Sequence, residues 1–66
     1  MKKAVIEATT RTECLVDRIS ETGARLRILA SCEIPAEFYL NIEGETTPRY
    51  CAVAARRPTQ TNVYFV

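Results

Sequence analysis

The feature that most constrains this 66-residue sequence is a period-two alternation of apolar side chains. An apolar residue occupies every second position in five segments, which are residues 4–9, 24–29, 38–43, 50–55 and 63–66. This alternation gives each strand one apolar face, as a half-buried β-strand requires. Turn-forming residues separate the segments, and the strand starts lie roughly 10 to 12 residues apart, a spacing typical of sandwiches and barrels.

The segment between the first two of these strands is irregular. Cys14 and Val16 share one parity, whereas Ile19 has the other. If Val16 and Ile19 both face the core, the strand carries a β-bulge near Asp17 and Arg18, and bulges often lie at barrel rims and beside binding sites. The alternative is that the strand ends at Asp17.

Short antiparallel strands need closure to remove exposed edges, so the pattern favours a small β-barrel. Residues 1–66 are too few for more than one domain. The segment 30–37 is neither clearly strand nor tight turn, and a short helical turn before Pro35 is one interpretation of it.

The composition argues against catalysis, metal binding and a membrane span. The chain has no His, and its three cysteines are widely spaced, so we expect no metal site, no catalytic residues and three reduced thiols, at Cys14, Cys32 and Cys51. No segment approaches the roughly 20 apolar residues of a membrane span, and Glu7 interrupts the only signal-like start. We therefore expect a cytoplasmic, non-enzymatic protein without a cofactor.

The charges favour a small anionic ligand over a long nucleic acid. Nine basic and eight acidic residues leave a net charge of +1, whereas binders of long nucleic acids are strongly basic. Most of the basic residues are Arg, whose planar fork suits phosphate groups and guanine edges.

The most informative stretch is the corner at residues 17–26. Ser20 can cap a turn with its hydroxyl, and Gly23 can supply a positive φ or let the backbone approach a ligand or a neighbouring strand. Arg18, Arg25 and Arg27 surround this turn in the sequence. The alternative interpretation is an ordinary hairpin corner with solvated arginines.

This corner resembles the Asp/Asn-x-Ser-x-x-Gly signature of PilZ domains, with Ser20 and Gly23 at matching positions. Residues 34–42, 49–56 and 62–66 are similar to later strands of that family, so the resemblance extends over residues 13–66. It implies a six-stranded antiparallel β-barrel that binds the bacterial second messenger cyclic di-GMP. The candidate ligand-binding residues are Asp17, Arg18, Ser20, Gly23 and Arg25.

The sequence also departs from the family pattern. Arg18 stands where the family has Asp or Asn, and its guanidinium offers donors only. Asp17 lies one residue early, which in a regular strand puts it on the opposite face. The family's N-terminal Arg-x-x-x-Arg is absent, and only Lys2 and Lys3 stand near that position. We therefore expect cyclic di-GMP binding to be weak, roughly millimolar, or lost.

Three functions follow from these observations. The first is a PilZ-like regulatory domain in cyclic di-GMP signalling. The second is a ligand-independent adaptor that binds a protein partner through the three tyrosines Tyr39, Tyr50 and Tyr64, which have the non-core parity. The third is a small RNA-binding barrel in which these tyrosines stack on bases beside Arg25 and Arg27. The sequence leaves both a monomer and a homodimer open.

Overall fold

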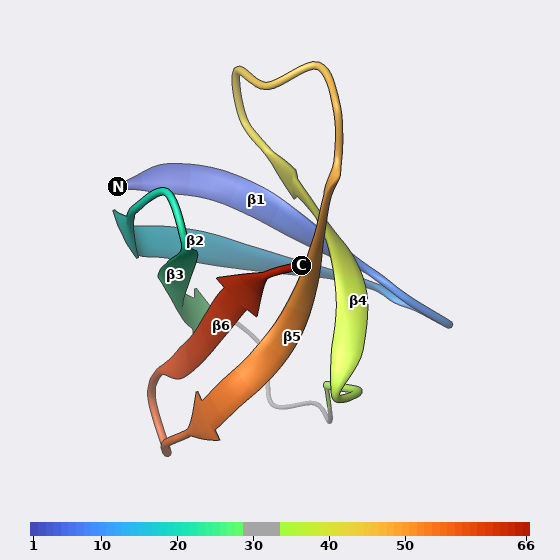
Figure 1. The fold of residues 1–66 in the computed structure, drawn as a ribbon. Coiled ribbons are helices and arrows are strands. Elements are labelled where there is room, and N and C mark those ends of the chain that lie inside the picture. The colour runs from blue at the N-terminus through green and yellow to red at the C-terminus, as the bar shows by residue number, and fades with distance from the viewer. Residues whose placement is uncertain (29–33) are drawn as a thin grey trace.

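The computed structural model describes residues 1–28 and 34–66, which form six antiparallel β-strands (Figure 1). The strands are β1 (Lys2–Glu7), β2 (Arg11–Ile19), β3 (Gly23–Ile28), β4 (Glu37–Ile42), β5 (Arg49–Arg56) and β6 (Thr61–Phe65). They form a closed barrel in the order β1-β2-β3-β6-β5-β4, in which β4 also pairs with β1. The expected all-β, six-stranded antiparallel barrel is confirmed. Of the segment 30–37 considered for a helical turn, residues 30–33 lie outside the described residues, Ile34, Pro35 and Ala36 are not helical, and Glu37 begins β4.

The alternating apolar rows meet inside the barrel and form its core. Leu26 and Leu40 are fully buried, and Ile6 is 2% exposed. The other buried members of this core are Ala4, Cys14, Val16, Ile34, Phe38, Ile42, Cys51 and Val63. The first strand is shorter than its alternation predicts, because it ends at Glu7 and Ala8 lies in the following turn.

Strand β2 carries a bulge at Asp17. Val16 pairs with Leu26 and Arg18 pairs with Arg25, so the residue between them has no partner of its own on β3. The bulge expected from the parity change is confirmed, and the alternative that the strand ends at Asp17 is wrong. Ile19 pairs with Ala24 but is 42% exposed, because it ends the strand at the rim of the barrel.

A second bulge lies in β5 at Ala54, where the register shifts between Val53 and Ala55. Ala55 pairs with Asn62, Asn62 pairs with Arg25, and Arg25 pairs with Arg18. The two bulges therefore lie at the same level on either side of the β3–β6 pair. Bulges bend a strand and increase its twist. Bends at the same height in β2 and β5, on either side of the β3–β6 pair, favour closure of so small a barrel.

Of the roles expected for Gly23, the close approach of a neighbouring strand is confirmed and the positive φ is not. Of the chain's two glycines only Gly44 has a positive φ, of 91°, so the interpretation that Gly23 supplies one is wrong. A Cβ added to Gly23 would lie 2.3 Å from the carbonyl oxygen of Val63. Gly23 is therefore needed because the backbone of β6 approaches β3 too closely for any side chain.

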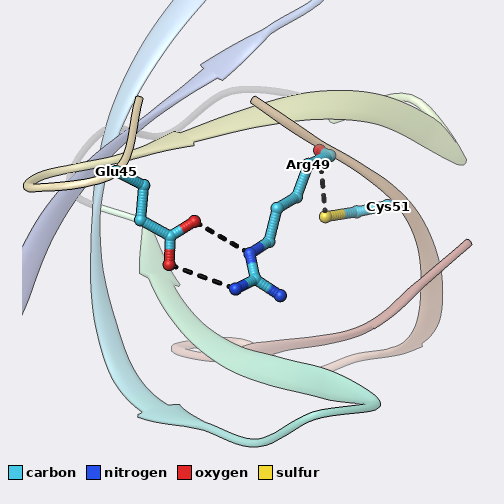
Figure 2. Close-up of polar contacts among 3 residues, drawn as sticks. All are labelled: Glu45, Arg49 and Cys51. Atoms are coloured by element: carbon cyan, nitrogen blue, oxygen red, sulfur yellow. Dashed lines mark hydrogen bonds and ion pairs between the residues drawn. The ribbon is translucent and has the colours of Figure 1, made fainter. Parts of the chain in front are cut away.

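An ion pair lies across the end of the barrel where β5 begins. Arg49 pairs with Leu40 in the β4–β5 ladder, and Figure 2 shows its side chain beside Glu45 from the loop between these strands. Arg49 Nε donates to Glu45 Oε1 at 2.8 Å and Nη2 donates to Oε2 at 3.2 Å, and these bonds lower the pKa of Glu45. Arg49 also stacks 4.6 Å above the ring of Phe65. These contacts tie the β4–β5 loop to the end of β6.

Replacing Gly23 by Ala is expected to lower the free energy of unfolding by about 1–3 kcal/mol, because the new methyl group would overlap backbone atoms of β6. Urea denaturation measures this loss. The control is Glu21→Ala, an exposed position in the same turn, which should change stability by less than about 0.5 kcal/mol. Equal stability of Gly23→Ala and the parent chain would show that the close approach is not required.

Candidate functional site

The bulge in β2 places two consecutive side chains on the outer face of the barrel. In a regular strand Asp17 and Arg18 would face opposite sides. The bulge leaves Asp17 without a partner in the ladder and puts Arg18 opposite Arg25. Asp17 Oδ2 accepts from Arg25 Nε at 3.1 Å and lies 3.0 Å from Arg25 Nη2. The expectation that Asp17 lies on the opposite face from its neighbour is therefore wrong, because the extra residue restores both to one face.

Arg27 extends this cluster along β3. Its Nε lies 4.0 Å from the same Asp17 oxygen, and the Asp17 side chain is 17% exposed. Lys3 stands in the same outward row as Arg27, with Leu15 between them. We call Asp17, Arg18, Arg25 and Arg27 the arginine corner; it holds three guanidinium groups and one carboxylate.

Arg18 and Arg27 are the exposed members of the arginine corner, and Arg18 lies nearest to the turn. Arg18 lies directly opposite Arg25 in the β2–β3 ladder. Within residues 1–28 and 34–66, Arg18 makes no ion pair, whereas Arg25 is paired with Asp17. Like charges directly opposite each other across antiparallel strands are destabilising. An anion bound between Arg18 and Arg25 would relieve this repulsion.

Ser20 shapes the turn that follows. Its backbone N–H donates to the Gly23 carbonyl at 2.8 Å, and its Oγ accepts from the N–H groups of Thr22 and Gly23 at 3.3 Å each. The Thr22 carbonyl in turn accepts from the Phe65 N–H at 2.8 Å, which fixes the turn to the end of β6. The Ser-x-x-Gly pattern is thus explained by the turn and by strand packing, without any ligand.

A hollow of about 290 Å³ lies beside the arginine corner. It is lined by Arg18, Ser20, Gly23, Ala24, Arg25, Asn62 and Val63. Four of the five residues singled out from the sequence therefore meet there, while Asp17 contacts Arg25 without lining the hollow. Small-molecule sites usually begin at about 300 Å³, so this hollow has room for one part of a nucleotide. Sequence reasoning missed Asn62, because its position follows from the long-range pairing of β3 with β6.

Another hollow, of about 480 Å³, lies beside β1 and the start of the β4–β5 loop. Its charged lining residues are Lys3, Glu13, Glu43 and Glu45. Three carboxylates against one ammonium group disfavour an anion there. The arginine corner is therefore the better candidate for an anionic ligand.

The tyrosines lie on the outer side of the barrel, as their parity predicts. Tyr39 and Tyr64 are 52% and 51% exposed. Tyr39 and Tyr50 pair across β4 and β5 with their ring centroids 5.0 Å apart in an edge-on arrangement. The Tyr50 hydroxyl donates to Glu37, which raises the pKa of Tyr50. These rings stabilise the β4–β5 pair, and Tyr64 is left without a ring partner among the described residues.

The thiols of Cys14 and Cys51 are free and buried in the core. Burial raises the pKa of each thiol to about 11, so both are protonated near neutral pH. Cys32 lies outside the described residues. The part of the chain that the structure describes holds no cluster of metal-ligating side chains and no helix long and apolar enough to cross a membrane.

Comparison of the chain with protein families, with curated proteins and with solved structures found no match.

In a Cys32→Ser variant, neither remaining thiol should react with an aromatic disulfide reagent at pH 8 while the protein is folded. A thiol with a pKa of about 11 carries only about one thiolate in a thousand molecules at this pH, and Cys14 and Cys51 are also shielded. Both should react once guanidinium unfolds the chain. Rapid stoichiometric labelling of the folded variant would contradict the burial of these thiols.

Proposed function

We propose that this chain is a non-enzymatic, PilZ-like regulatory domain that binds cyclic di-GMP weakly at the arginine corner. The observation that carries the proposal is the placement of Arg18 directly opposite Arg25 on the outer face. A phosphate between the two guanidinium groups would relieve their repulsion and accept charge-assisted hydrogen bonds from both. The planar fork of Arg is well matched to phosphate oxygens.

The hollow beside these arginines favours a nucleotide over a bare phosphate. Asn62 lines the hollow and pairs with Arg25, so its amide stands next to the phosphate position. An amide offers both a donor and an acceptor, which is the combination needed to bind a guanine edge. Gly23 and Ala24 leave the floor of the hollow without large side chains.

The affinity should be low for two reasons visible in the site. The hollow is open and holds only one part of the ligand, and Asp17 already neutralises part of the charge on Arg25. A millimolar dissociation constant, which corresponds to about 4 kcal/mol of binding free energy, agrees with these features.

The second candidate function is a ligand-independent adaptor that binds a protein partner. It is supported by the exposure of Tyr39 and Tyr64, each about half exposed on the outer side of the barrel. Tyrosine is enriched at protein interfaces because a rigid ring combines apolar area with a polar hydroxyl. The two candidates differ in whether the arginine corner binds a nucleotide.

A ¹H–¹⁵N NMR titration with cyclic di-GMP is expected to show saturable shifts at residues 18–25 and Asn62, with a dissociation constant on the order of 1 mM. Arg18→Gln should weaken binding about tenfold, because it removes one of the two opposed charges. The matched control is Arg57→Gln, at an exposed position in the β5–β6 turn, which should leave the dissociation constant unchanged.

The absence of shifts in a spectrum of the folded barrel would overturn binding at the corner and favour the adaptor. Equal weakening by the Arg18 and Arg57 variants would show that only net charge attracts the nucleotide. Shifts confined to the tyrosines of β4 and β6 would place the binding surface elsewhere.

A further inference from the structure

The Asp17 carboxylate is held as a bound anion would be. Its Oδ2 accepts from Arg25 Nε at 3.1 Å, lies 3.0 Å from Arg25 Nη2 and is 4.0 Å from Arg27 Nε. The two guanidinium groups come from alternate positions of one strand, so both project from the outer face of β3. Two Arg side chains converging on one oxyanion form the arrangement by which proteins bind phosphate and carboxylate ligands.

We infer that Arg25 and Arg27 form a second phosphate subsite, and that Asp17 occupies it as a competitor supplied by the chain itself. This inference rests on the proposed function and deepens it. Arg18 lies across the ladder from Arg25, roughly 5 Å away between backbones, and Arg27 lies roughly 7 Å further along β3. A ligand with two phosphates, such as a cyclic dinucleotide, can therefore reach both positions once Asp17 no longer holds the second.

The position of Asp17 also argues against a role as an acceptor for a base. The hollow beside the corner is lined by Arg18, Arg25 and Asn62, and Asp17 does not line it. Its hydrogen-bonding oxygen is directed to the guanidinium groups of β3. If the carboxylate bound the base, its removal would weaken ligand binding. If the carboxylate competes with a phosphate, its removal would strengthen ligand binding.

The test compares Asp17→Asn with the parent chain in NMR titrations, using cyclic di-GMP and, separately, inorganic pyrophosphate. Neutralising the competitor should lower the dissociation constant for both ligands about tenfold, with new shifts at Arg27. Adding Arg27→Gln to Asp17→Asn should abolish the gain. Asp17→Ser provides a second neutral variant if the Asn variant does not fold.

The matched control is Glu21→Gln, which removes one negative charge from an exposed position in the adjacent turn. It should leave both dissociation constants within about twofold of the parent values, because Glu21 makes no contact with the arginines in the described residues. An equal gain in the Glu21 and Asp17 variants would attribute the effect to net charge and overturn the subsite.

The remaining outcomes separate this inference from the proposed function. If the parent chain binds cyclic di-GMP and Asp17→Asn binds it equally or more weakly, the competitor role is overturned while the binding site stands. If neither chain binds cyclic di-GMP but Asp17→Asn gains pyrophosphate binding, the subsite stands and the proposed ligand falls. If neither chain binds either ligand, both are overturned.

Discussion

The arginine corner depends on the β-bulge in β2, where Asp17 is an extra residue in the ladder with β3. With regular pairing, Asp17 would lie opposite Arg25 and Arg18 would turn toward the barrel interior, where an unpaired guanidinium is costly. The bulge shifts Arg18 to the position opposite Arg25 while Asp17 stays within reach of the same side chain. One inserted residue therefore keeps a charge out of the core and gathers the charged groups on one face.

The rest of the barrel holds this corner in place. The bulge at Ala54 lies level with the one at Asp17, so the sheet bends on both sides of β3 and β6 at the same height. Gly23 lets β6 approach closely, and the Ser20 turn is tied through Thr22 to Phe65. Phe65 in turn packs under Arg49, whose ion pair with Glu45 lies across the barrel end (Figure 2). The backbone around the corner is thus fixed by strand contacts, which favours a preformed anion site over one built by a mobile loop.

The sequence predicted most of the fold because period-two alternation is a local signal. The apolar rows predicted strands and their buried faces, and the parity of Ile19 predicted the bulge. Which strands pair with each other around the barrel depends on contacts between residues far apart in the sequence, and no local pattern specifies it. For that reason Asn62, the contact of Asp17 with Arg25, and the placement of Arg49 at the barrel end were not foreseen. For Gly23 the sequence left two local roles open, and the close approach of the β6 backbone is the one that holds, because Gly23 has no positive φ.

The central claim is that Asp17 is an inserted residue in the β2–β3 ladder, and cross-strand nuclear Overhauser effects test it most directly. The account predicts that the backbone protons of Arg25 show their strong cross-strand contacts with Arg18, and those of Leu26 with Val16, while Asp17 has no partner of its own. Strong contacts between Asp17 and Arg25 together with contacts between Arg18 and Ala24 would mean regular pairing. That result would turn Arg18 inward and contradict the arginine corner.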